Sequence, residues 1–220
     1  PLFSEECGTL HGLRCPACSS LAPAHGHLNK VAHFAGEFGA AMFPPDSHES
    51  KAARRWGQLA GWWHDLGKFA PAWQEYLKAK ADVHESEVTG KVDHSTAGAK
   101  FATEQGANGQ LLGYLIAGHH AGLADGSSLF YERLPKTVAP WRESMGDQTI
   151  LDFPVPPKLA ITLRKEDALF ACSLHARMLF SCLVDADFLA TEAFMNEEAF
   201  RDRPDYPANV LERMAESLRN

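Results

Sequence analysis

The adjacent pair His64-Asp65 is the part of the sequence best suited to chemistry. A neutral imidazole offers one nitrogen to a metal ion, and a carboxylate has two oxygens that can each bind a different cation. The pair therefore favours a site with two metal ions, completed by other histidines and by a late aspartate. The candidates for these positions are His27, His94, His119, His120, and either Asp187 or Asp185. The pattern predicts a metal-centred hydrolase.

The chain has 11 histidines, so each candidate competes with the simpler interpretation of a histidine that packs in the core or lies on the surface. The neighbourhood of His64 favours the metal site, because Asp65, Gly67 and Lys68 follow it at the end of a predicted helix. Histidines without such a context are not assigned to the metal pair; they are His25, His33, His48, His84 and His175.

Apolar residues recur at helical spacing through most of the chain. The predicted helices span residues 27–43, 51–67, 71–81, 93–106, 108–122, about 166–192, and 210–219, with Asp93 as a helix cap. Residues 83–92 are predicted to form a loop, and 122–157 an irregular region with short helical stretches near 130–134 and 136–145. No β-hairpin pattern occurs. The fold class predicted is all-α, a helical bundle with long irregular loops.

The composition restricts the partners and the location of the protein. A net charge of −7 argues against a broad electrostatic grip on nucleic acid, so such contacts should be local, metal-assisted or supplied by a partner. No run of about 18 apolar residues occurs, and the N-terminal residues lack the layout of a secretory signal. We therefore expect a cytoplasmic protein that does not bind a membrane.

The first 26 residues are interpreted as an N-terminal extension with its own ligand pattern. Cys7, His11, Cys15 and Cys18 could form a small tetrahedral zinc site around the Cys-Pro-Ala-Cys turn. A single CxxC without a second pair is a weak signal, so unliganded, reduced thiols remain the alternative.

Five motifs follow one another in the order of a known family. They are HLNKVA at 27–32, WWHDLGKF at 62–69, DHSTAGA at 93–99, AGHHAGL at 117–123 and LFSCLVDADFLATE at 179–192. Together they resemble the HD nuclease domain of the CRISPR-associated helicase-nuclease of type I interference, a branch of the HD phosphohydrolase superfamily. The resemblance implies an HD-domain helical bundle, and residues 27–220 are assigned to this domain.

The resemblance also implies which residues bind each metal ion. The first ion would be held by His27, His64, Asp65 and the late aspartate, and the second by Asp65, His94, His119 and His120. Asp65 would bridge the two ions. The mixed nitrogen and oxygen ligands favour Mn, Fe, Co or Ni over Mg, which prefers oxygen and water.

Two further site residues depend on the family pattern. Asp185 and Asp187 lie about 200° apart around a helix and cannot both face one site. Asp187 is preferred because Ala186-Asp187-Phe188-Leu189 matches the family motif, and Asp185 remains the alternative. Lys68 occupies a family position from which it could hold a phosphate oxygen, although a solvated lysine at a helix end is the alternative.

Aromatic and basic residues near the motif have two interpretations each. Trp56 and Trp63 share the apolar helix face, so Trp62 and Trp73 are the tryptophans that could stack on nucleic-acid bases. The basic cluster of Lys51, Arg54 and Arg55 is either a solvated helix face or a DNA track.

The function predicted from these observations is metal-dependent endonuclease activity on single-stranded DNA in CRISPR interference. The resemblance implies a superfamily 2 helicase and a guide-RNA surveillance complex as partners. The 220 residues contain no GxxxxGK[ST] phosphate loop, so they do not form an ATP-driven helicase themselves. The alternatives are an HD phosphohydrolase acting on a nucleotide or cyclic nucleotide, and a scaffolding domain that keeps a metal for stability.

Overall fold

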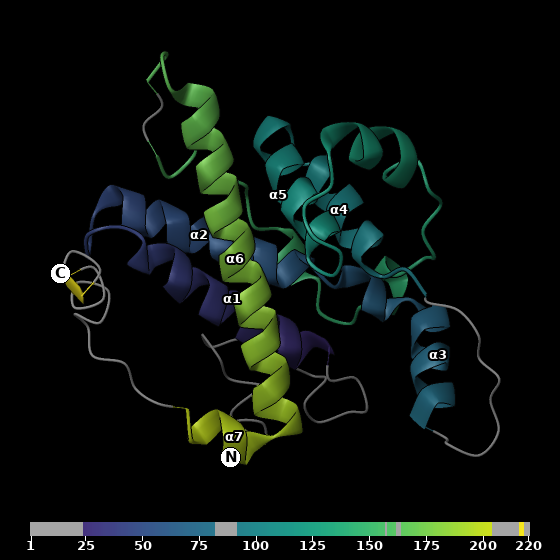
Figure 1. Cartoon of the computed structure of the whole chain (residues 1–220). Helices are drawn as coiled ribbons and strands as arrows, with labels where there is room; N and C mark the ends of the chain where they lie inside the picture. The colour runs from purple at the N-terminus through teal and green to yellow at the C-terminus, as the bar shows by residue number, and fades with distance from the viewer. Residues whose placement is uncertain (1–23, 82–91, 157, 162–163, 204–215, 218–220) are drawn as a thin grey trace.

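The structure is a computed structural model that describes residues 24–81, 92–156, 158–161, 164–203 and 216–217 (Figure 1). Within these residues it is all-α and contains no strand, which confirms the predicted fold class. The α-helices are α1 (Ala24–Ala41), α2 (His48–Trp63), α3 (Pro71–Ala81), α4 (Ser95–Thr103), α5 (Ala107–Gly118), α6 (Ala168–Met195) and α7 (Glu197–Arg201). The short helical turns are η3 (Leu66–Phe69), η4 (Ser128–Arg133), η5 (Arg142–Ser144) and η6 (Thr149–Leu151).

Helices α1 and α2 pack side by side and form the scaffold of the site. Their backbones touch, since a Cβ atom on Gly57 would lie 2.1 Å from the carbonyl oxygen of Ala35. Side chains from both helices are fully buried between them, including Leu28 and Leu59. Burial of each such leucine contributes about 1.5–3 kcal/mol. This close pairing fixes the first turn of α1 against the last turn of α2.

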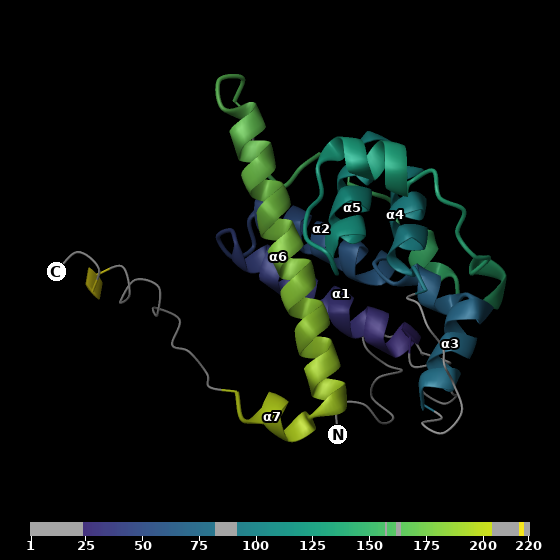
Figure 2. The same ribbon diagram turned by 45° about the vertical axis from the view of Figure 1, so that its right-hand side comes forward.

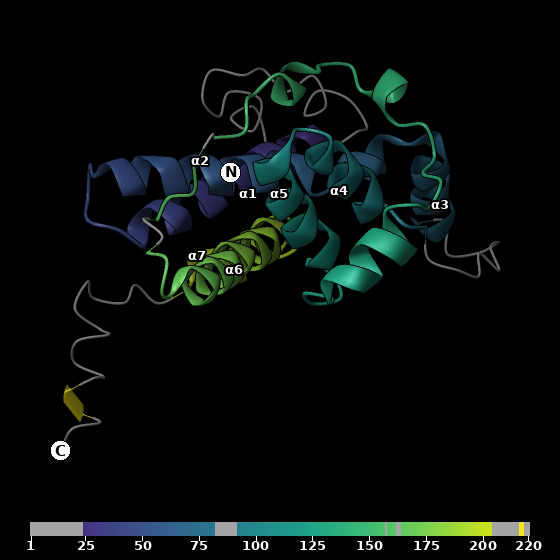
Figure 3. The same ribbon diagram turned by 90° about the horizontal axis from the view of Figure 1, so that it is seen from above.

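The segment between α5 and α6 covers the outer side of α2. Trp56 and Trp63 have no exposed surface, and their indole nitrogens donate hydrogen bonds to the carbonyls of Lys158 and Ile150 over 3.2 and 2.7 Å. Figure 3 shows this segment running over α2 on the side away from α6. The two tryptophans that were assigned to the core therefore lie in it.

Helix α6 crosses α1 and packs mainly against it, with smaller contacts to α2 and α5. Its N-terminal end projects beyond the other helices in both Figures 1 and 2, and there Leu169 and Phe170 are 90 % and 72 % exposed. By length and composition alone α6 could cross a membrane, which is weak evidence because core helices of soluble proteins pass the same test. Its middle reaches the helices that carry the candidate metal ligands.

Helices α4 and α5 form a second packed pair beside α2. Asp93 caps α4 as predicted, because its side chain accepts a hydrogen bond from the backbone N–H of Thr96 over 3.0 Å. A hydroxyl hydrogen bond from the same threonine to Asp93 adds to the cap. The cap sets where α4 begins and hence where His94 lies.

Helix α2 differs from its prediction at both ends. It begins at His48, with Ser47 as its N-cap, and it ends at Trp63 instead of continuing to Gly67. The backbone N–H of Gly67 donates to the carbonyl of His94, a partner in another part of the chain, and a Cβ atom at Gly67 would lie 2.2 Å from that oxygen. The α-helix therefore ends before Gly67 and is followed by the tighter turn η3. The hydrogen bond from Gly67 holds the residue before α4 against η3.

Some predicted features lie outside the described residues. They are the loop at 83–92 except for its last residue, the zinc ligands Cys7, His11, Cys15 and Cys18, and most of the final helix at 210–219. The short helical stretches predicted near 130–134 and 136–145 correspond to η4 and to the three residues of η5.

Candidate metal centre

Asp65 lies at the centre of the site, immediately after α2, and its side chain is completely buried. Its Oδ2 atom is 3.0 Å from Nε2 of His64 and 3.8 Å from Nε2 of His27. Its Oδ1 atom is 3.3 Å from Nε2 of His94 and 3.6 Å from Nε2 of His119. The two oxygens of one carboxylate therefore face two different sets of imidazoles.

The first ligand group consists of His27, His64, Asp65 and Asp187, whose ligand atoms all lie within 4.8 Å of one another. They come from the first turn of α1, the end of α2 and the middle of α6. Asp187 Oδ1 lies 3.0 Å from Nε2 of His27 and 3.6 Å from Nε2 of His64. Asp185 belongs to neither group and is exposed on α6.

The second ligand group consists of Asp65, His94, His119 and His120, again with ligand atoms within 4.8 Å of one another. His94 directly precedes α4, and His119 and His120 directly follow α5. The Nε2 atoms of His94 and His120 are 2.7 Å apart. His120 is exposed, so this group is open to solvent on one side.

Backbone carbonyls orient three of the histidine rings. Nδ1 of His64 lies 2.8 Å from the carbonyl oxygen of Gly61, and Nδ1 of His119 lies 2.7 Å from that of Ile116. Nδ1 of His94 lies 3.3 Å from the carbonyl oxygen of Val92. A carbonyl can only accept, so these Nδ1 atoms carry the proton. In the neutral rings Nε2 then keeps a lone pair aimed into the cluster, as in histidines that bind metals.

Five of the converging atoms are buried and form no hydrogen bond of regular geometry, although their neighbours in the cluster and Lys68 lie within ion-pair distance. They are Nε2 of His27, His64 and His119, and both carboxylate oxygens of Asp65. Buried polar atoms are rarely left in this condition, since each costs free energy comparable to a lost hydrogen bond. Imidazole nitrogens and carboxylate oxygens in two groups of four fit a pair of divalent cations.

The carboxylates of the site are held in their charged forms. Burial raises the pKa of Asp65, but His64 and Lys68 outweigh it and hold the pKa well below its ordinary value. The pKa of Asp187 is lowered in the same way, because the nearby imidazoles of His27 and His64 outweigh its burial. Both carboxylates are therefore ionised at neutral pH and available to cations.

Among the site histidines, His64 differs from the others whose pKa is shifted; burial lowers the pKa of His27 even though Asp187 lies beside it. Burial lowers the pKa of His64, but the charges of Asp65 and Asp187 outweigh it and raise the pKa to about 10. Burial lowers the pKa of His94, and it lowers that of His120 to about 4 with help from the charge of His119. His94 and His120 of the second group are therefore already in the neutral form that binds metal.

Lys68 and Trp73 lie at the open side of the site. Lys68 Nζ is 2.5 Å from Asp65 Oδ2, and its side chain is 25 % exposed. The half-buried ring of Trp73, on α3, lies 4.3 Å from the ring of His94 between centroids. Lys68 Nζ is also 5.9 Å from the centre of the Trp73 ring. The cation thus contacts the carboxylate oxygen that faces the first group, and the aromatic ring borders the second group.

The expectation that Trp62 could reach a substrate is wrong. Its side chain is 5 % exposed, its indole N–H donates to Asn29 Oδ1 over 3.0 Å, and its ring stacks on Phe153. In the basic cluster, Arg54 pairs with Glu37, and Arg55 lies over the ring of Phe153. These contacts favour the interpretation of a structural helix face over that of a DNA track.

Of the histidines left out of the site, His33, His48 and His175 belong to neither ligand group. The side chain of His25 and the whole of His84 lie outside the described part of the chain. A residue that the sequence did not indicate is Arg133, in η4, whose side chain bonds to the ends of α4 and α5.

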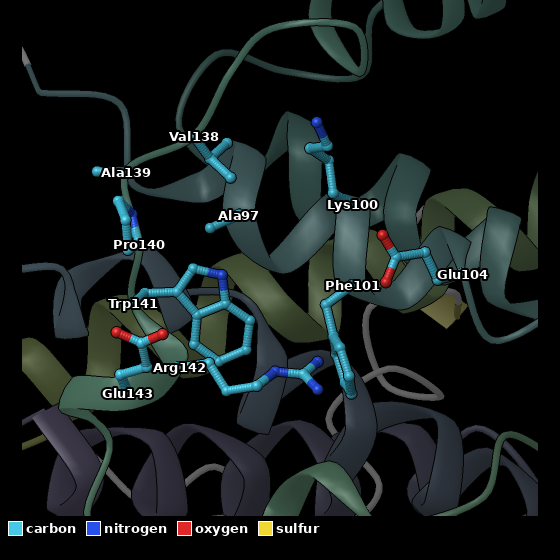
Figure 4. A pocket seen from close by; sticks show the side chains of 10 residues that line it. All are labelled: Ala97, Lys100, Phe101, Glu104, Val138, Ala139, Pro140, Trp141, Arg142 and Glu143. Atoms are coloured by element: carbon cyan, nitrogen blue, oxygen red, sulfur yellow. The ribbon is translucent and has the colours of Figure 1, made fainter.

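A pocket of about 230 Å³ lies on the face of α4 that meets the segment before η5 (Figure 4). Phe101 and Trp141 form part of its wall, and Lys100, Arg142, Glu104 and Glu143 bring charges of both signs. A smaller pocket of about 180 Å³ lies between α5 and η4. Neither of these two pockets is lined by any of the seven ligand residues.

A protein-family model described as "Cas3, HD domain" matches residues 19–184, about three quarters of the chain. The matched range contains six of the seven candidate ligands, and Asp187 lies just beyond it. No match was found among curated proteins.

Proposed function

The chain belongs to the family of Cas3 HD domains, and from this premise we propose that it is a nuclease that hydrolyses phosphodiester bonds of single-stranded DNA with two metal ions. The family is one of metal-dependent hydrolases associated with CRISPR systems. The observation that carries the proposal is the position of the Asp65 carboxylate, whose two oxygens face two separate groups of imidazoles.

Divalent cations in the two groups would supply an activated water and neutralise charge on the phosphate. The chain's own residues would make this possible in distinct ways. Asp65 would bridge the ions, and Asp187 would complete the first group. Lys68 lies at the open side, where its ammonium group would hold a non-bridging phosphate oxygen as a point charge. The nitrogen-rich ligand set favours Mn, Fe, Co or Ni over Mg.

Several observations favour an extended strand over a small nucleotide as substrate. The second group opens to solvent at His120, and Trp73 offers an aromatic face beside His94. The strand is therefore the preferred substrate.

A partner would compensate for the acidic charge of the chain. With a net charge of −7, the protein needs DNA to be delivered, and a superfamily 2 helicase acting with a guide-RNA surveillance complex would do this in the cytoplasm. The exposed apolar side chains at the N-terminal end of α6 are available for a protein contact. A zinc site at Cys7, His11, Cys15 and Cys18 remains a prediction.

The test is cleavage of circular single-stranded DNA by metal-stripped protein, with Mn, Co, Ni, Fe, Mg or Zn added in turn. Asp65→Ala should abolish cutting and lower the bound metal to less than one ion per chain, because the bridging carboxylate serves both ions. Asp185→Ala is the matched control on the exposed side of α6. Cutting at the normal rate by Asp65→Ala would refute the two-metal nuclease. Metal-dependent hydrolysis of nucleotides without cutting of DNA would point to the small-substrate alternative.

A further inference from the structure

Arg133 is the last residue of η4, in the irregular segment between α5 and α6, and it contacts both helices that carry the second ligand group. Its Nε donates to the hydroxyl oxygen of Thr96 over 3.1 Å, and its Nη2 donates to that of Ser95 over 2.6 Å. Its Nη1 donates to the backbone carbonyl of Ala117. One planar guanidinium group thus bonds to two separate helices.

The partners of Arg133 are close in sequence to the candidate ligands. Ser95 follows His94, and Ala117 lies two residues before His119. The arginine therefore bonds to the first turn of α4 and to the last turn of α5. His94 directly precedes the one turn, and His119 directly follows the other. Nη2 of Arg133 also lies 4.0 Å from Oδ1 of Asp93, the cap of α4. The described partners of Arg133 thus belong to α4, its cap and α5, whereas the first group comes from α1, α6 and the end of α2.

The position of Arg133 between the start of α4 and the end of α5 has a physical reason. The last carbonyls of a helix have no partner within the helix, and a cation near that end is favourable. Ser95, Thr96 and Ala117 are all buried, so loss of Arg133 would leave the Ala117 carbonyl and the Ser95 hydroxyl short of a partner. A lysine could not replace it fully, because an ammonium group lacks the planar fork that reaches three acceptors at once.

We propose that Arg133 is a positioning residue that sets the distance between His94 and His119 and so maintains the second metal position. The inference rests on the proposed metal centre. It adds that one of the two ion sites depends on a residue that would contact neither the ion nor the substrate.

The experiment compares Arg133→Gln and Arg133→Lys with the unchanged protein, each as the full 220-residue chain. Manganese bound per chain is measured after dialysis, together with the manganese dependence of DNA cleavage. Arg201→Gln is the matched control, because it removes an arginine of α7 whose side chain is largely exposed and pairs with Glu197 on the same helix. Thermal unfolding without metal separates a positioning role from a general loss of structure.

We expect the unchanged protein to bind two ions and Arg133→Gln to bind one. Cleavage by Arg133→Gln should fall by about 10- to 100-fold, the usual loss when a residue behind a metal ligand is changed. Excess manganese should restore part of the rate, and Arg133→Lys should be intermediate. If Arg133→Gln does not fold, Ser95→Ala, which removes one of the three bonds, should show the same effect more weakly.

Two ions with unchanged cleavage in Arg133→Gln would overturn the inference. So would equal loss of both ions in a folded variant, because the arginine would then support the whole site. Absence of bound metal in the unchanged protein would instead refute the metal centre itself, and the inference with it.

Discussion

The two ligand groups share Asp65 but are built by different means. The first group is carried by α1, α6 and the residues that directly follow α2, and its centre lies between packed helices, with His64 and Asp65 fully buried. The second group is carried by the residue before α4 and the residues after α5, and it includes the exposed His120. Helix packing and the carbonyl of Gly61 hold the first group, whereas the cap at Asp93, the carbonyls of Val92 and Ile116, and Arg133 hold the second.

This difference suggests different tasks for the two groups. A position inside a packed bundle changes its geometry only if the bundle repacks, and such cores are close-packed and stiff. A position formed by helix ends can adjust more cheaply, since few apolar contacts have to change. The first group is therefore suited to retain an ion, and the second to exchange ions and meet the substrate.

The largest effect is expected from the two aspartates of α6. Asp187→Asn should remove the first ion and reduce DNA cleavage by more than the roughly 10- to 100-fold typical of changes behind a ligand. Asp185→Asn should leave both properties near normal, because Asp185 is exposed and belongs to neither group. Metal analysis and cleavage rates of the pair check this. Similar losses in both variants would contradict the geometry of α6.

An intermediate effect is expected from pH. The pKa of His64 is raised to about 10, so its ring is protonated at neutral pH and an ion in the first group must displace that proton. The pKa of His94 is lowered and that of His120 is about 4, so these two imidazoles of the second group release no proton when they bind an ion at neutral pH. Manganese affinity of the first group should therefore rise from pH 6 to 9, about tenfold per pH unit for one released proton.

Calorimetry can assign that proton to a group. Manganese titrations in two buffers with different heats of ionisation give the number of protons released. His120→Ala, which retains the first group, should release one proton, and Asp187→Asn should release fewer. Equal release by the two variants would show that the groups do not differ in this property.

The smallest effect is expected at Trp73. Replacement by alanine should weaken binding of single-stranded DNA by about 1–3 kcal/mol if a base stacks on the indole ring. Bound manganese should not change, because Trp73 contributes no ligand atom. Fluorescence anisotropy with a labelled oligonucleotide measures the difference, and Trp73→Phe should retain most of the affinity. Unchanged affinity in Trp73→Ala would remove this residue from the DNA-binding surface.

The parts of the molecule that local sequence pattern determines were predicted well. Helical period identified the main described helices, and adjacent histidines and aspartates pointed to seven residues that lie together in the structure. The 100° turn per residue indicated that Asp185 and Asp187 could not both face the site, and the resemblance to the family motif favoured Asp187. The metal-binding role of the seven residues remains a proposal.

Features that depend on distant contacts were missed. Arg133 lies in a segment without apolar period, and its partners are 16 to 38 residues away. The end of α2 at Trp63 depends on the contact between Gly67 and the carbonyl of His94. Trp62 is buried because Phe153, from the segment before α6, covers the helix face that period alone assigns to solvent.

The shared carboxylate of Asp65 makes the two metal positions thermodynamically dependent on each other. A cation on one oxygen withdraws negative charge from the other, so the second ion binds more weakly than it would alone. By reciprocity the second ion weakens the first by the same factor. At low metal concentration most molecules would carry a single ion, and hydrolysis would begin only when the supply fills the open position. Activity would then follow the availability of metal in the cell.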